Sequence, residues 1–290
     1  MPELPEVETV VRDLRPSLAG RRLTAARRLT RHALRKPWRV AWSASLAGAR
    51  VESVRRRGKW IVLDLDGGRH LVLHLGMTGQ LTVTDAAAPV QDHTHLIFDL
   101  EGDTRQLRFR DIRRFGSATL FPTGDALERF FESSGLGPEP FGLDADYWRK
   151  RLAATDRAIK AVLLDQGVVA GVGNIYADES LFEARLHPAL RACDLDGRAA
   201  DRLRRAVATV LGRAIERRGS SIRNYVGGSG MQGGYQNEFR AYGRTGQPCP
   251  RCGAAIACVR LAGRATHFCP ECQKEHSPQR HKEHKEEPSK

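Results

Sequence analysis

The chain has 290 residues, with 47 Lys and Arg against 34 Asp and Glu, which gives a formal net charge of +13. Residues 273–290 hold five basic and four acidic residues, so the positive excess lies in the body of the chain and favours a polyanionic partner, nucleic acid before a membrane surface. No apolar run approaches the roughly 20 residues of a membrane span and the start has no apolar leader, so we expect neither a membrane protein nor a secreted one.

The first residues predict a short amphipathic helix over 5–14. Four apolar residues follow the i, i+3, i+4, i+7 spacing of one buried helix face: Val7, Val10, Val11 and Leu14. Pro5 suits the first turn of this helix, and Pro16 is expected to end it. We therefore expect the N-terminus to be anchored by packing, unlike the frayed ends of most chains.

Residues 20–122 predict β-strands. The stretch KWIVLDLDGGRHLVLHLG alternates apolar and other residues on both sides of a turn at Asp66-Gly67-Gly68, which is typical of a β-hairpin. HLIFDLEGDTRQLRFR repeats this form around Gly102. Several such hairpins indicate a β-sandwich or barrel, and the Gly- and Pro-rich SSGLGPEPFG after them indicates a linker.

The second half of the chain predicts helices at 147–164, 175–186 and 199–217. A glycine-rich loop follows at 219–235, and a loop this long inside a globular protein is functional or disordered. The charged and repetitive end, 276–290, is expected to be disordered.

Four cysteines in two CxxC pairs predict a tetrahedral site for one structural zinc ion: Cys249, Cys252, Cys269 and Cys272. Sixteen residues separate the pairs, and they predict two short strands around Ala262-Gly263, a hairpin too small to fold without the metal. Two disulfides are the alternative, which the lack of a secretory context disfavours.

Six motifs occur in a fixed order along the chain. They are PELPEVET at 2–9, RRRGKW at 55–60, HLGMTGQL at 74–81, RRFG at 113–116, GVGNIYADESLF at 171–182 and GRATHFCPEC at 263–272. Together they resemble the formamidopyrimidine-DNA glycosylases, bacterial base-excision enzymes also called 8-oxoguanine DNA glycosylases. The resemblance runs from residue 2 to about residue 273.

The resemblance implies an α+β multidomain fold with DNA bound in a cleft between domains. An N-terminal helix on a β-sandwich would occupy 1–135, a helix–two-turn–helix domain 136–240 and a Cys₄ zinc β-hairpin 241–275, before the tail 276–290. This agrees with the elements predicted from the residues alone.

The catalytic residues implied by the resemblance begin with Pro2. Removal of Met1 would free its secondary amine, and an α-amine with a pKa of roughly 7.7–8.0 is partly unprotonated at neutral pH. The resemblance makes Glu3 the proton donor and Glu6 its hydrogen-bonding support. Lys59 would contact phosphate and lesion and donate a proton in β-elimination, and Arg264 would assist the second elimination.

Each of these assignments has a structural alternative. Glu3, Glu6 and Glu8 could simply favour a helix N-terminus through its dipole. Lys59 could belong to a solvated basic turn, and Arg264 could be one surface arginine among many.

The DNA contacts implied by the resemblance fall into three groups. His74, Lys160 and Asn174 would touch phosphates, although Asn174 could equally be the N-cap of the helix after it. Three residues would fill the gap left by the flipped base, with plain core packing as the alternative for the first and last: Met77, Arg113 and Phe115. Four residues of the glycine-rich loop would grip the flipped purine: Ser220, Ser221, Arg223 and Tyr225.

The expected protein is a monomeric, cytoplasmic, nucleoid-associated glycosylase and AP lyase that acts on double-stranded DNA containing oxidised purines. One alternative is an enzyme of the endonuclease VIII type, which acts on oxidised pyrimidines. Another is a zinc-dependent DNA-binding protein without catalysis.

Overall fold

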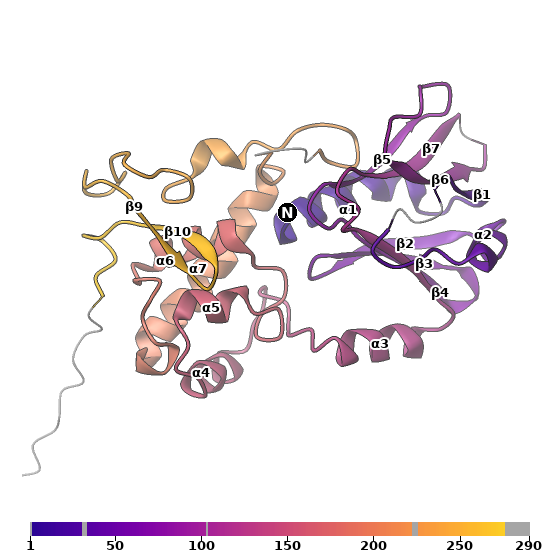
Figure 1. Cartoon of the computed structure of the whole chain (residues 1–290). Coiled ribbons are helices and arrows are strands. Elements are labelled where there is room, and N and C mark those ends of the chain that lie inside the picture. Colours follow the sequence, from indigo (N-terminus) through magenta and orange to yellow (C-terminus); the bar gives the residue numbers. More distant parts are fainter. Residues whose placement is uncertain (1, 31–33, 103, 222–225, 276–290) are drawn as a thin grey trace, which may run out of the picture.

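The computed structural model describes residues 2–30, 34–102, 104–221 and 226–275. These residues form two lobes, and the N-terminus lies between them (Figure 1). None of the helices in these ranges is long and apolar enough to cross a membrane.

The N-terminal lobe is a sandwich of two four-stranded antiparallel sheets, with strand orders β1-β6-β7-β5 and β2-β3-β4-β8. The inner faces share one apolar core, to which Leu63, Phe98 and Phe109 belong. The sandwich and the turn at Asp66–Gly68 confirm the sequence-based prediction. The strands are β1 Leu23–Arg28, β2 Val51–Arg57, β3 Trp60–Leu65, β4 Arg69–His74, β5 Gly79–Asp85, β6 Thr94–Leu100, β7 Arg105–Asp111 and β8 Ser117–Phe121.

Helix α1 (Leu4–Leu18) packs into both lobes. Its side chains Val7, Val10, Val11 and Leu14 belong to the sandwich core, while Leu4 belongs to the core of the other lobe. The N-terminus is thereby fixed at the junction of the two lobes.

The expectation that Pro16 ends this helix is wrong, since α1 continues to Leu18. Pro16 lies in the last turn, where its missing N–H removes one hydrogen bond, and Ala19 still donates to the Arg15 carbonyl at 3.0 Å.

Two helices of this lobe were not predicted. Helix α2 (Val40–Leu46) buries only Leu46, so it leaves no helical pattern in the sequence. Helix α3 (Gly124–Ser133) covers the outer face of the sheet β2-β3-β4-β8, where Leu127 and Phe131 pack against Val62 and Val72.

The second lobe is helical, as predicted, and surrounds the buried helix α6. It contains α4 (Ala145–Ala153), α5 (Ile159–Leu164), α6 (Asn174–Ala184) and α7 (Gly197–Glu216). The single helix predicted over 147–164 is interrupted, because Ala158 forms a β-bridge with Arg191. Nine of the eleven residues of α6 are buried, so this helix forms the centre of the lobe.

The C-terminal hairpin consists of β9 (Ala257–Leu261) and β10 (Arg264–Phe268). Its turn at Ala262 and Gly263 has positive φ at both residues, the geometry of a tight hairpin turn, and confirms the prediction. Strand β10 packs against α6, whereas most of β9 is exposed. Short 3₁₀ turns occupy Asp66–Gly68, Ala192–Asp194 and Tyr235–Glu238.

The predicted domain limits stay predictions, and the tail 276–290 lies outside the described residues.

Candidate active site

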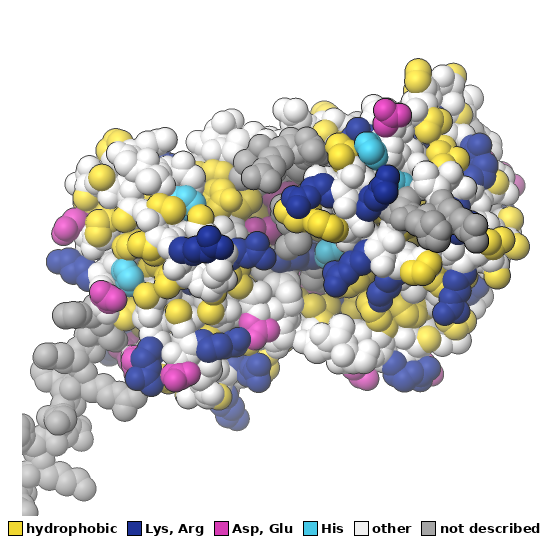
Figure 2. All heavy atoms as spheres, in the orientation of Figure 1, with side chains coloured by type: hydrophobic (Ala, Val, Ile, Leu, Met, Phe, Trp, Pro, Cys, Tyr) yellow, Lys and Arg dark blue, Asp and Glu magenta, His cyan; other side chains and the backbone are white. Residues whose placement is uncertain are grey.

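A cleft of about 580 Å³ opens between the lobes. Residues of the sandwich, of the helical lobe and of the C-terminal hairpin line it. Pro2 and Glu3 enter it from the start of α1, Lys59 from the turn between β2 and β3, and Arg264 from the tip of the hairpin. Lys and Arg side chains flank the recess between the lobes on the face shown in Figure 2. The structure therefore brings together the four residues predicted to be catalytic.

The Glu3 carboxylate lies at the N-terminus of α6. It accepts backbone hydrogen bonds from Gly173 at 2.7 Å, Ile175 at 3.0 Å and Tyr176 at 3.4 Å. A helix N-terminus stabilises an anion, and here the anion is a side chain of the protein itself. Glu3 thus does more than favour the start of its own helix.

Burial raises the pKa of Glu3 to about 7, and the nearby ammonium of Lys59 opposes this rise. A large fraction of the carboxyl is therefore protonated near neutral pH. That is the state a proton donor needs.

Glu6 connects three parts of the site. Its Oε2 accepts the Glu3 N–H at 2.8 Å, while Oε1 accepts the Tyr176 hydroxyl at 2.5 Å and the Ser220 N–H at 2.7 Å. Glu3 and Glu6 also form a capping box at the start of α1, so the helix role and the supporting role coexist. Burial raises the pKa of Glu6 as well.

Lys59 is buried in the wall of the cleft, with Nζ 2.9 Å from the Val172 carbonyl oxygen. Burial lowers its pKa and Arg264 contributes to this shift, while Glu3 and Glu6 oppose it. The solvated-turn interpretation is therefore wrong for this lysine.

Arg56, three residues before Lys59, faces the linker between the lobes. Arg56 bridges Glu8, at 3.0 Å, and Glu139, at 2.7 Å, and Glu139 also accepts the Gly58 N–H at 2.6 Å. The basic turn is thus tied to α1 and to the linker, which fixes the start of β3.

Two loops of the sandwich present the residues predicted to fill the DNA gap. Phe115 is 46% exposed, and the Arg113 guanidinium lies over its ring at 5.0 Å from the centroid. Met77 and Arg113 line the cleft. Core packing is therefore excluded as the role of Phe115.

Thr78 and Asp111 join these two loops. The Thr78 hydroxyl donates to Asp111 Oδ1 at 2.6 Å and accepts the Arg113 N–H at 3.0 Å. The other Asp111 oxygen accepts the Gly116 N–H at 2.7 Å. Sequence reasoning missed both residues, although Thr78 lies within HLGMTGQL and Asp111 lies two residues before RRFG.

His74 is a neutral ring packed 4.6 Å from the ring of Trp60, and it is not among the residues that line the cleft. Burial lowers its pKa to about 4, with Lys59 and Arg35 adding to the shift. Its Nδ1 accepts the Gly76 N–H at 3.0 Å, so the proton resides on Nε2. Any phosphate contact of His74 would use this N–H and not a positive charge.

The other two predicted phosphate contacts differ in outcome: the geometry corrects Lys160, whereas for Asn174 it contradicts only the alternative role of N-cap. Lys160 is fully buried, with Nζ 2.6 Å from Asp178 Oδ1, so its ammonium is not presented to a phosphate. Asn174 is not an N-cap, because Gly173 occupies that position and Asn174 Nδ2 donates to the Ala265 carbonyl at 3.0 Å. Asn174 still lines the cleft.

The described part of the glycine-rich loop is tied to the site. Ser220 binds Glu6 through its N–H and, at 3.1 Å, its hydroxyl. Ser221 donates its N–H to Gln236 and accepts the Gly233 N–H at 2.8 Å. Arg223 and Tyr225 lie outside the described residues.

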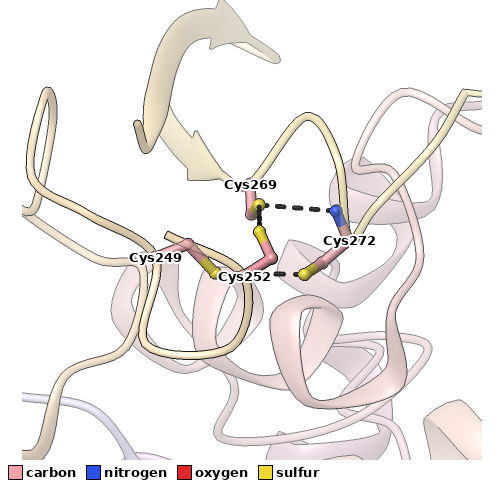
Figure 3. A group of neighbouring side chains, drawn as sticks. All are labelled: Cys249, Cys252, Cys269 and Cys272. Carbon is pink, nitrogen blue, oxygen red and sulfur yellow. Dashed lines mark hydrogen bonds between the residues drawn. The ribbon is translucent and has the colours of Figure 1, made fainter. Parts of the chain in front are cut away.

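The four predicted cysteines converge on one point, with side chains directed toward one another (Figure 3). Their sulfur atoms lie within 4.8 Å of one another, including Cys252–Cys269 at 3.5 Å and Cys249–Cys272 at 3.9 Å. Tetrahedral zinc with Zn–S bonds of about 2.3 Å separates its sulfurs by roughly 3.8 Å. The cluster therefore fits zinc.

Three family models match the chain. They describe the formamidopyrimidine-DNA glycosylase N-terminal domain, over residues 1–118, the formamidopyrimidine-DNA glycosylase H2TH domain, over 136–226, and a zinc finger found in FPG and IleRS, over 246–274. The formamidopyrimidine-DNA glycosylase of Desulforamulus reducens is 42% identical, with 94% of this chain and 99% of the relative covered. That of Heliobacterium modesticaldum is 44% identical, covering 94% of this chain and all of the relative.

Solved structures agree with this assignment. A Lactococcus lactis FPG variant in complex with DNA containing Fapy-dG has a TM-score of 0.88 at 35% identity, covering 94% of this chain and 100% of that one. A complex of Lactococcus lactis Fpg with DNA containing an abasic site has a TM-score of 0.86 at 35% identity, covering 94% and 99%. The chain belongs to the formamidopyrimidine-DNA glycosylase family.

Proposed function

We propose that this protein removes oxidised purines from duplex DNA and then cleaves the abasic site, with the amine of Pro2 as nucleophile. The observation that carries the proposal is the carboxyl of Glu3. It adjoins Pro2, has a pKa raised to about 7, and lies in a cleft shared with Lys59 and Arg264. A volume of about 580 Å³ is ample for one flipped nucleotide.

The first step needs a free amine at residue 2. Once Met1 is removed, the Pro2 nitrogen attacks C1′ of the damaged nucleotide, the C1′–N9 bond breaks, and the base leaves with the electron pair. The protonated Glu3 carboxyl supplies the proton that the departing group or the opening sugar needs. The attacking nitrogen loses its proton, the C1′–O4′ bond then breaks as O4′ takes up a proton, and the product is an open-chain iminium ion. Because Pro2 is a secondary amine, this ion has no nitrogen-bound proton left to lose.

The iminium then acts as the electron sink for two eliminations. Loss of the C2′ proton breaks the C3′–O3′ bond, and later loss of the C4′ proton breaks the C5′–O5′ bond, each phosphate leaving with the electron pair. Lys59 has a lowered pKa and a place in the cleft wall, which suit it to exchange protons here. Arg264 would hold the phosphate of the second elimination.

The two loops joined by Thr78 and Asp111 supply the groups that replace the flipped base. Met77 would fill the stack, Arg113 would hydrogen-bond the orphaned cytosine, and the exposed Phe115 would wedge between base pairs. This set favours an oxidised purine opposite cytosine over an oxidised pyrimidine.

One zinc ion would be held by Cys249, Cys252, Cys269 and Cys272. A closed Cys₄ site supplies folding energy and has no open position for substrate. The metal would therefore fix the hairpin that carries Arg264. The monomeric state and the location at the nucleoid stay predictions.

Borohydride trapping tests the proposal. With a duplex containing 8-oxoguanine opposite cytosine, the protein should give a covalent adduct on its N-terminal peptide, which mass spectrometry identifies. A permanent N-terminal extension, which turns the Pro2 nitrogen into an amide, should abolish the adduct, and Pro2→Gly should weaken it. Absence of an adduct from the unmodified protein would reject the mechanism and leave a DNA-binding protein without catalysis.

The substrate class is tested separately. Excision of 8-oxoguanine should exceed excision of thymine glycol, and the reverse order would assign the protein to the endonuclease VIII type.

A further inference from the structure

A buried ion pair joins the helical lobe to the hairpin, next to Arg264. Lys160 in α5 and Asp178 in α6 both have fully buried side chains, and their charged atoms lie 2.6 Å apart. Neither residue lines the cleft. The pair therefore has no direct part in the chemistry proposed above.

The pair binds three consecutive residues of β10. Lys160 Nζ donates to the Ala265 carbonyl at 3.0 Å and to the Thr266 hydroxyl at 2.8 Å. Asp178 Oδ2 accepts the His267 N–H at 2.9 Å and lies 3.0 Å from His267 Nδ1. These are the residues that directly follow Arg264.

A buried ion pair adds little stability compared with apolar residues of the same shape, because both charges lose their hydration. Its directional contacts can instead select one arrangement of the elements that it joins. Here the contacts select the register of β10 against α5 and α6.

The metal site alone does not fix the hairpin tip. Arg264 lies five residues from Cys269, about 16 Å along an extended strand. The partner strand β9 is mostly exposed, and an isolated two-stranded hairpin is marginally stable in water. A second anchor near the tip is required if Arg264 is to keep one position over the cleft.

We propose that Lys160 and Asp178 are positioning residues that hold Arg264 at the scissile phosphate and so control the second elimination. The inference rests on the proposed function, in which Arg264 serves that step. Breakage of the C5′–O5′ bond should depend on the pair, whereas iminium formation at Pro2 should not. Lys160 acts through β10 and not through a phosphate, because its ammonium is enclosed.

The test compares the full-length, zinc-loaded protein with Asp178→Asn on a duplex labelled on the 5′ side of an abasic site. Denaturing gels separate the unsaturated aldehyde end of the first elimination from the 3′-phosphate end of the second. The ratio of 3′-phosphate to aldehyde product should fall by about tenfold, toward that of Arg264→Ala. The rate of borohydride trapping should stay at the wild-type value.

Two further variants keep the test decisive if Asp178→Asn folds poorly. Thr266→Val removes one anchoring hydroxyl, and the pair Lys160→Met with Asp178→Leu removes both charges while filling the space. Both should lower the product ratio. Arg157→Gln, which breaks the exposed ion pair of Arg157 with Asp165, is the matched control and should leave the ratio unchanged.

The salt dependence of DNA affinity separates positioning from a phosphate contact. The comparison is made in Arg264→Ala, which has already lost the phosphate contact of Arg264. If Lys160 touched a phosphate, adding Lys160→Met with Asp178→Leu to Arg264→Ala would reduce the slope of log affinity against log salt further, by about 1, the contribution of one contact. We expect no further reduction. Folded variants with the wild-type product ratio, or a further reduced slope in Arg264→Ala, would overturn the inference alone, whereas a wild-type protein that gives no borohydride adduct would reject the proposed function as well.

Discussion

The Glu3 carboxylate lies 2.7 Å from the backbone nitrogen of Gly173, where a β-carbon on residue 173 would stand 2.4 Å from Glu3 Cδ. The first turn of α6 thus needs glycine to let the carboxyl approach its N–H groups. The position of the proposed acid depends on a residue 170 positions away in the chain.

Gly173→Ala should therefore displace Glu3 and slow base excision by about 100-fold, since a misplacement near 1 Å has an effect of that size. Overpacking should also lower the free energy of unfolding by about 1–3 kcal/mol. Single-turnover excision and urea unfolding measure the two effects. Gly212→Ala, in α7 with no atom within 4 Å of the added carbon, is the control and should be active and slightly more stable.

The raised pKa of Glu3 predicts the pH dependence of base excision. The amine of Pro2 must be deprotonated, with a reference pKa of roughly 7.7–8.0, and Glu3 must be protonated, with a pKa of about 7. The single-turnover rate should therefore pass through a maximum between about pH 7 and 8 and fall at higher pH. An abasic substrate has no base to expel, so its cleavage should lack the alkaline fall if Glu3 protonates the departing base. An identical fall for both substrates would assign the proton of Glu3 to the opening sugar, and no alkaline fall for either would contradict the role of Glu3.

The raised pKa of Glu3 also makes the free energy of unfolding depend on pH. The folded pKa of Glu3, about 7, lies above the unfolded value of 4.5, so the folded state holds an extra proton between these pH values and its stability decreases as pH rises. Compared with Glu3→Gln, the wild-type protein should lose about 3 kcal/mol between pH 4.5 and 7. Chemical unfolding at several pH values measures this difference, and a constant difference would show that the pKa of Glu3 is normal.

Much of this site was predictable because its residues lie in contiguous motifs. Pro2 and Glu3 share one motif, Lys59 and Arg264 each lie in another, and the cleft brings all four residues together. The strand alternation around Asp66–Gly68 and the cysteine spacing predicted the sandwich and the hairpin for local physical reasons.

The rest depends on contacts between distant segments. The resemblance predicts a phosphate contact for Lys160, whereas in the fold its buried ammonium pairs with Asp178. Asn174 is of a residue type that is common at N-caps. In the fold, however, the carboxylate of Glu3 binds the N–H groups of the first turn, and the Asn174 side chain binds Ala265 instead. Helix α2 buries one residue only, so no periodic pattern marks it.

The hydrogen bonds of Thr78 join the two loops that carry Met77 and Arg113, and their loss should change the preference for the base opposite the lesion. Thr78→Val removes the hydroxyl that binds both Asp111 and the Arg113 N–H, leaving two polar partners unpaired at a cost of about 1–3 kcal/mol. Arg113 should then lose its fixed position, and the preference for cytosine opposite the lesion should weaken. Excision opposite cytosine and opposite adenine measures this preference.

Thr82→Val is the matched control for that substitution. Thr82 lies in β5, the strand that begins directly after Thr78, and its hydroxyl contacts only Thr84, at 3.3 Å, among the contacts described. The preference of Thr82→Val for the base opposite the lesion should equal that of the wild-type protein. Equal preferences for Thr78→Val and Thr82→Val would mean that the bridge does not position Arg113.

Metal removal should affect the hairpin and spare the helical lobe. Cys249 and Cys269 share a small apolar cluster with Phe182 and Ile256, whereas helices α4–α7 have a separate and larger core. A strong chelator should therefore melt β9 and β10 with little loss of helical circular dichroism, and added zinc should restore the hairpin. DNA affinity and the 3′-phosphate product should both decrease.

Arg264→Ala shows whether zinc acts on the chemistry only through this arginine. If it does, the variant should already lack most of the 3′-phosphate product, and chelation should lower its product ratio no further. Metal analysis must confirm that zinc has left the protein. A zinc-free wild-type protein with an unchanged product ratio would show that the hairpin keeps Arg264 in place without the metal, through the contacts of β10 with Lys160, Asp178 and Asn174.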